Sequence, residues 1–199
     1  MIKKIMKISL LIFIYILLTQ MLFAKSIIIK SIPGTVDDFL KIRDSIAKTP
    51  EGGAAVMILA LLIYTKDEEL GKKCLTIAIS LDLLTEGNYY KGYQVNASNM
   101  SLIRSQLKKE SQIPRSYIKG AVPDNGYTIP EGDIVLDFFI TKYSGDMGSG
   151  LYKVFVECSG ASARPVTLKI NDKGLWKAYE WSSLIVGVQA PKKVKSDNL

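Results

Sequence analysis

A chain of 199 residues, 48% of them hydrophobic, is long enough for one well-buried core and too short for several domains. It contains no histidine, which excludes Ser-His-Asp and Cys-His catalysis as well as histidine-ligated metal sites. The formal net charge of +7 is moderate and is only weak evidence for a nucleic-acid partner, against which the secretory pattern described next argues.

The first 24 residues have the pattern of a secretory signal peptide. Lys3, Lys4 and Lys7 precede an apolar run over Ile8–Phe23, and Ala24 is a small residue at the expected cleavage point. Without this leader the chain has 23 basic and 19 acidic residues, a net charge of +4. We expect an exported protein, periplasmic or extracellular. The alternative is a protein anchored to the membrane by an uncleaved N-terminal helix, its only membrane contact.

Four segments with helical apolar spacing follow the leader. Thr35 is predicted to cap the first helix, and Asp67 precedes the third. The second is announced by Thr49-Pro50-Glu51, and its body, Ala54–Tyr64, is apolar on all sides, which predicts a fully buried helix. Residues 88–95 are interpreted as a connection, after which Ser98 is predicted to cap the fourth helix.

After Ile113 the apolar period changes to two. Strands are predicted over residues 134–141, 152–158, 166–170 and 175–181, and the apolar stretch 184–188 completes the core. Helices followed by an antiparallel meander predict the α+β class, with N-terminal helices packed on a C-terminal β-meander. We expect a single domain over residues 25–190 and a basic flexible tail over residues 191–199.

Several short motifs occur in order along this domain. They are TPEGGAA at residues 49–55, Arg115–Tyr117 with Pro123–Tyr127, RPVTL at 164–168, GLWK at 174–177 and SSL at 182–184. Together they resemble an uncharacterised family of exported bacterial proteins with a domain of unknown function. The likeness covers about residues 32–188, and it implies no particular activity.

Two cysteines, Cys74 and Cys158, allow one intramolecular pair. Export to an oxidising compartment favours a disulfide. Both cysteines have apolar neighbours, which equally favours two buried free thiols. The spacing matches neither a zinc knuckle nor a Cys-x-x-Cys redox pair, so no metal and no cofactor is expected.

Two other features carry a chemical and a structural interpretation. Gly52 and Gly53 lie at a helix start, where backbone N–H groups bind anions, but we favour close packing of the buried helix. Asp137, Glu157 and Glu180 lie on three predicted strands, where paired carboxylates would act as general acid and base. Their alternation with apolar residues favours the solvated side of the sheet instead.

The long connection between the helices and the strands is the candidate ligand-binding region. Its side chains for recognition are Arg115, Tyr117, Asp124, Asn125 and Tyr127. No catalytic residue is assigned. We therefore expect a non-catalytic binding or interaction module of the bacterial envelope, with a protein or small-molecule partner. The alternative is a histidine-free, carboxylate-dependent hydrolase of an envelope polymer.

Overall fold

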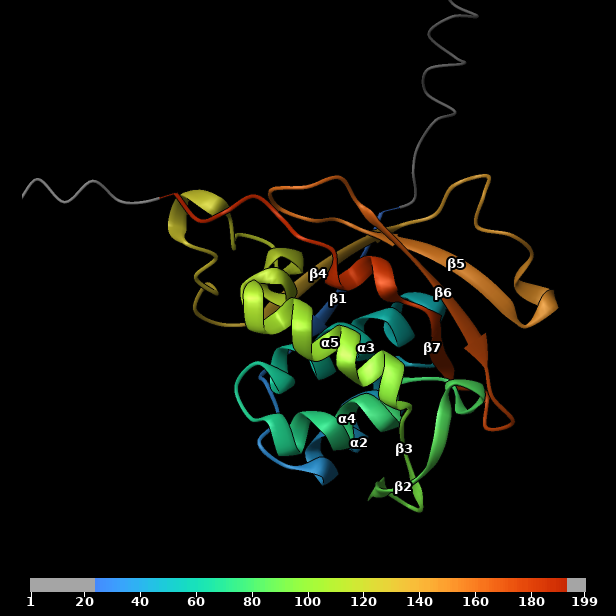
Figure 1. The fold of residues 1–199 in the computed structure, drawn as a ribbon. Helices are drawn as coiled ribbons and strands as arrows, with labels where there is room; N and C mark the ends of the chain where they lie inside the picture. The colour runs from blue at the N-terminus through green and yellow to red at the C-terminus, as the bar shows by residue number, and fades with distance from the viewer. Residues whose placement is uncertain (1–23, 193–199) are drawn as a thin grey trace, which may run out of the picture.

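The structure is a computed structural model that describes residues 24–192. One antiparallel sheet is packed on one face by the helices, and a small hairpin lies at the lower edge (Figure 1). The class is α+β, as the sequence predicted. The predicted leader up to residue 23 and the tail from residue 193 lie outside the described residues.

Four helices occupy the first half of the described chain. They are α2 (Val36–Ile46), α3 (Pro50–Tyr64), α4 (Glu68–Ala78) and α5 (Ala97–Lys109). Thr35 caps α2, as predicted, because its side chain accepts a hydrogen bond from the Asp38 N–H. The predicted cap of α5 at Ser98 is wrong. Asn96 accepts from the Asn99 N–H instead, and the helix begins at Ala97.

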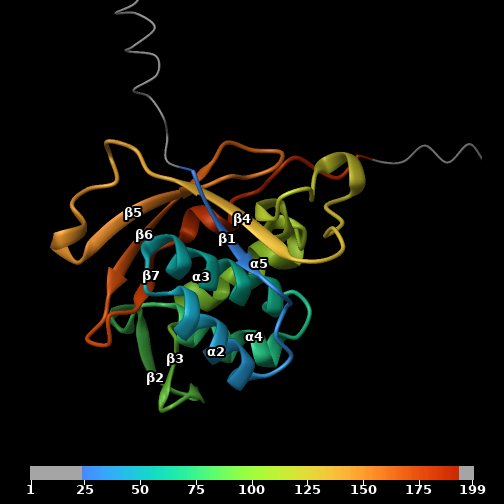
Figure 2. The ribbon, with the colours of Figure 1, turned by 180° about the vertical axis from the view of Figure 1, so that it is seen from behind.

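Helix α3 is the buried centre of the domain (Figure 2). Every residue of α3 except Glu51 is buried, so its apolar sequence fits an interior helix and not a surface one. It packs against α2 and α4 on one side and against β7 on the other. An added Cβ at Gly53 would lie 2.6 Å from the carbonyl oxygen of Trp176. The glycine pair therefore serves close packing, as predicted.

The main sheet has the strand order β1-β4-β5-β6-β7. Its strands are β1 (Lys25–Ile29), β4 (Ile134–Phe139), β5 (Leu151–Val156), β6 (Arg164–Ile170) and β7 (Trp176–Glu180). The predicted meander is confirmed for β4 to β7, all paired antiparallel. The stretch that completes the core forms a 3-10 turn, Ser182–Ile185, with Leu184 and Ile185 buried.

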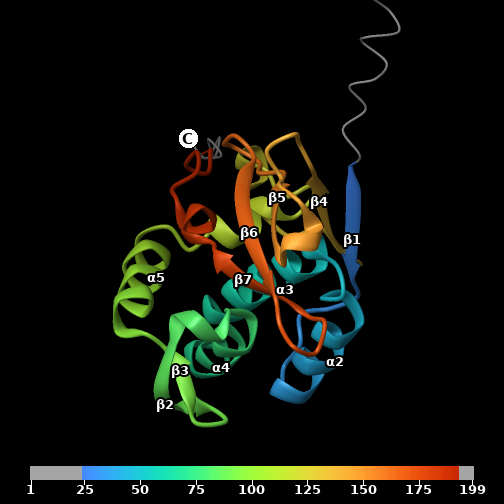
Figure 3. The same ribbon diagram turned by 90° about the vertical axis from the view of Figure 1, so that its right-hand side faces the viewer.

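Strand β1 was not predicted. It pairs antiparallel with β4, with Ile27 opposite Leu136, and its side chains Ile27 and Ile29 point into the core. Strand β1 is thus an edge strand, and its other side faces away from the sheet (Figure 3).

The stretch interpreted as a connection also contains regular structure. It forms the hairpin of β2 (Leu84–Tyr90) and β3 (Tyr93–Val95). Lys91 and Gly92 make its turn with positive φ angles of 50° and 83°. The hairpin packs on α4.

Candidate functional site

The two tyrosines of the predicted recognition region are buried. The Tyr117 hydroxyl donates to the carbonyl of Leu184 at 2.9 Å, and the Tyr127 hydroxyl donates to the carbonyl of Gln189 at 2.7 Å. Burial raises the pKa of both phenols. Through these hydrogen bonds the two tyrosines hold the segment after β7 against the loop. The prediction that they face a ligand is therefore corrected.

The other three residues of that region lie apart. Asn125 accepts from the Val122 N–H at 3.0 Å and donates to the Gly120 carbonyl at 2.8 Å, which stabilises a turn. Asp124 forms an exposed ion pair of 2.6 Å with Lys192. Arg115 is half-buried, and its Nε has no hydrogen-bond partner among the described residues. The loop therefore presents no gathered set of recognition side chains.

Of the three candidate carboxylates, Asp137 and Glu157 line one small cavity of about 170 Å³ and Glu180 does not, so the three do not form one acid-base site. Asp137 accepts hydrogen bonds from Ser26 at 2.5 Å and from Lys119 at 2.9 Å, and these bonds lower its pKa. It is ionised at neutral pH and has no proton for a leaving group. Glu157 follows β5 opposite Asp137, whereas Glu180 accepts from Thr167 at 2.5 Å on β7, at the far edge of the sheet.

Both cysteines are buried free thiols in the structure. Cys74 lies inside α4, and burial raises its pKa to about 12. Cys158 follows β5, where its sulfur lies 3.3 Å from the Ser116 hydroxyl and burial again raises its pKa. Neither side chain has the thiolate character that a nucleophile needs.

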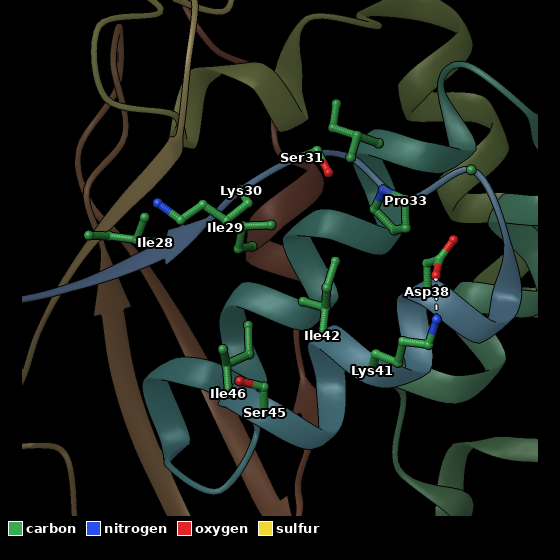
Figure 4. A pocket seen from close by; sticks show the side chains of 12 residues that line it. Ile28, Ile29, Lys30, Ser31, Pro33, Asp38, Lys41, Ile42, Ser45 and Ile46 are labelled. Carbon is green, nitrogen blue, oxygen red and sulfur yellow. Dashed lines mark hydrogen bonds and ion pairs between the residues drawn. The ribbon is translucent and has the colours of Figure 1, made fainter.

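A groove of about 470 Å³ lies between the end of β1 and helix α2 (Figure 4). Ile29 and Pro33 form its buried floor, and Ile42 and Ile46, one helical turn apart on α2, form its wall. At the rim, Ile28 is 54% exposed. Sequence reasoning missed this groove because it did not assign β1, although the apolar run Ile27–Ile29 was a signal for it.

The backbone beside this groove is free to bind. Residues 30–34 make no hydrogen bond through their backbone to any described residue. Strand β1 pairs only with β4 within the described chain, so the hydrogen-bonding groups along its other edge are also available. An open strand edge next to apolar side-chain pockets is the arrangement by which sheets take up an extended peptide.

The lysines at the groove form ion pairs with neighbouring aspartates, so their charges are neutralised. Lys30 contacts Asp133 at 2.7 Å, and Lys41 contacts Asp38 at 2.9 Å. The hydrogen bond from Lys41 lowers the pKa of Asp38, so this pair stays charged at neutral pH. A ligand for the groove therefore needs apolar side chains and no particular net charge.

The comparisons with known proteins give one match. The model of a family described as a domain of unknown function (DUF6935) matches residues 31–192. No curated protein and no solved structure gives a match. Between residues 24 and 192, no helix is long and apolar enough to cross a membrane, and no cluster of three or more potential metal ligands of the His, Cys, Asp and Glu types occurs.

Proposed function

We propose that this chain, which belongs to the DUF6935 family of domains of unknown function, is an exported, non-catalytic module that binds an extended apolar segment of a partner protein. The observation that carries this proposal is the free backbone of residues 30–34 alongside the apolar groove. Most of this segment is exposed, so its backbone groups bond to water, and a partner strand would replace that water with main-chain hydrogen bonds beside an apolar surface.

The binding mode follows from the open edge of β1 and the apolar groove beside it. The partner segment adds as a strand to the open edge of β1, which supplies affinity through main-chain hydrogen bonds. Its alternate side chains enter the groove between Ile29 and the α2 residues Ile42 and Ile46. A volume of about 470 Å³ lies within the range typical of ligand sites.

The location in the envelope is part of the same proposal. It is supported by the basic, apolar and small-residue pattern of residues 1–24 and by the resemblance to exported bacterial proteins. A binding module exported in this way meets its partner segments in the periplasm or outside the cell. The partner itself is defined here only by its chemistry, an extended stretch with apolar residues at alternate positions.

A random-peptide library selected on the purified protein tests the groove. We expect enriched peptides with apolar residues at alternating positions. Ile28→Glu at the exposed rim should weaken their binding at least about tenfold, because a carboxylate is then buried under the peptide. The matched control is Leu102→Glu, which places the same charge at an exposed apolar position of α5.

Amide hydrogen exchange tests the main-chain part of the mode. A bound peptide should slow exchange at alternate amides of this segment, either Lys30 and Ile32 or Ser31, because successive N–H groups of an extended chain point to opposite edges; none of them has a partner within the described chain. If selected peptides bind both glutamate variants as tightly as the original protein, or leave these amides unprotected, this groove is not the binding site.

A further inference from the structure

A second cavity, of about 410 Å³, lies at the opposite edge of the sheet from β1. The end of α4, the hairpin strand β2, the turn between β6 and β7, and Arg43 of α2 line it. Four of its lining side chains are basic, namely Arg43, Lys169, Lys173 and Lys177, and two are acidic, Asp82 and Asp172. The cavity is therefore cationic.

Three of these cations crowd together at the sheet. Lys169 and Lys177 are directly opposite each other on β6 and β7, a like-charge pair across neighbouring strands. Asp82 binds Lys169 at 2.6 Å, and Asp44 binds Arg43 at 2.7 Å. Asp82 and Asp44 are thus engaged with the neighbours of Lys177, and Asp172, the other acid of the cavity wall, forms no ion pair with Lys177.

Lys177 is left without a counterion. Among residues 24–192 its ammonium group makes no ion pair and no side-chain hydrogen bond. Burial, with a further contribution from the charge of Arg43, lowers its pKa to about 8. A half-buried ammonium beside two other cations is an arrangement that an anion would stabilise.

The uncharged part of the wall is largely apolar, with Thr76, Ser80 and Asn171 as its small polar residues. Ile77 and Ile79 are buried at the end of α4, while Leu81 is 59% and Ile170 is 40% exposed. Large apolar side chains that remain exposed beside a cavity are suited to contact the apolar part of a ligand.

We propose that this cavity binds a small molecule with an anionic group, a carboxylate or a phosphate, attached to an apolar body. The anionic group lies between Lys177 and Arg43, and the apolar body covers Leu81 and Ile170. This site is independent of the peptide groove, because the two cavities share no lining residue.

Binding by this site depends on pH through Lys177. The charged and titratable groups around it are Arg43, Asp44, Tyr90, Asp82, Lys169, Asp172 and Lys173. The Asp82–Lys169 hydrogen bond lowers the pKa of Asp82 and raises that of Lys169, so both keep their charge between pH 7 and 9. An anion favours the protonated form of Lys177. The affinity of the site for an anion should therefore rise as the pH falls from 9 to 7.

Nuclear magnetic resonance of the protein with lysine labelled at the ε-carbon tests the proposal. Octyl phosphate, octanoate and inorganic phosphate are titrated separately, and the pKa of Lys177 is followed in each case. We expect octyl phosphate or octanoate to raise this pKa by about one unit or more, and inorganic phosphate to bind more weakly than octyl phosphate. The two alkyl probes decide between a phosphate and a carboxylate.

Variants separate binding from folding. Lys177→Met should weaken binding of the preferred alkyl probe at least about tenfold, whereas Lys177→Arg should retain it. The matched control is Lys153→Met on β5, a half-buried lysine outside the cavity. The proposal is overturned if no probe raises the pKa of Lys177, or if the Lys153 and Lys177 methionine variants bind the alkyl probes equally well. Equal binding of inorganic and octyl phosphate would overturn the role of the apolar wall.

Discussion

Replacement of Gly53 by alanine tests how tightly the buried helix α3 is packed. The added Cβ would lie 2.6 Å from the carbonyl oxygen of Trp176 and 2.8 Å from its Cβ, whereas ordinary van der Waals contact begins at 3.4 Å. The two elements must therefore separate by about 0.8 Å (3.4 − 2.6). Such movement is opposed on both sides, because α3 is buried and the Trp176 N–H is bound to the Ala47 carbonyl at 2.8 Å.

The expected cost follows from two opposing effects. Overpacking of this size costs about 1–3 kcal/mol, and a clash with backbone belongs at the upper end of that range. Alanine recovers up to about 1 kcal/mol of helix propensity over glycine. We expect Gly53→Ala to lower the free energy of unfolding by about 2 kcal/mol, with a fall of roughly 4–8 °C in Tm for a domain of this size.

Urea denaturation followed by tryptophan fluorescence measures this loss, and Gly34→Ala is the control. A Cβ at Gly34 meets no atom within 4 Å, and its φ is not in the left-handed region. Its stability should stay within about 0.5 kcal/mol of the original protein or rise slightly. If Gly53→Ala proves as stable as Gly34→Ala, the close approach of α3 to β7 is wrong.

Three further predictions concern stability and reactivity. Lys177→Met should raise the free energy of unfolding at pH 7 by about 1–3 kcal/mol, because burial of the ammonium lowers its pKa to about 8. The stability advantage of the methionine variant should shrink as the pH rises from 8 toward 10.5, because in this range folded Lys177 is neutral while the unfolded lysine still binds its proton. A difference in unfolding free energy that stays constant with pH in urea titrations would contradict this prediction. Cys74 and Cys158 should resist a thiol reagent in the native protein and both react in urea without reductant; no reaction in urea would indicate a disulfide. Asn96→Ala should cost about 1 kcal/mol in the same denaturation assay and Ser98→Ala much less, and the reverse order would restore Ser98 as the cap of α5.

The helices and the meander were predictable because each leaves a local pattern in the sequence. Thr49 before Pro50, together with an all-apolar run, identified the buried helix α3. Strict alternation over residues 134–139 identified β4, whose alternate residues are buried. Strand β1 shows no comparable alternation of apolar and polar residues that sets it apart from its surroundings. Its five residues directly follow an apolar leader, and its partner β4 lies far along the chain.

The candidate sites were harder to predict, because they depend on contacts between distant segments. Tyr117 and Tyr127 occur among polar residues, which is typical of an exposed loop. Only the return of the chain after β7 buries them, through the carbonyls of Leu184 and Gln189. Lys177 likewise alternates with Trp176 and Ala178 as a solvent-facing residue would, and Arg43 of α2 is brought beside it only by the tertiary fold.

The position of β1 matters for anyone who produces this protein. The family match starts at residue 31, two residues after β1 ends. A recombinant chain begun at that boundary would strip the first strand from the sheet and uncover the edge of β4, together with the apolar side chains that Ile27 and Ile29 now shield. An open edge beside uncovered core side chains recruits other strands, so such a product should self-associate more strongly in solution than one begun at Ala24.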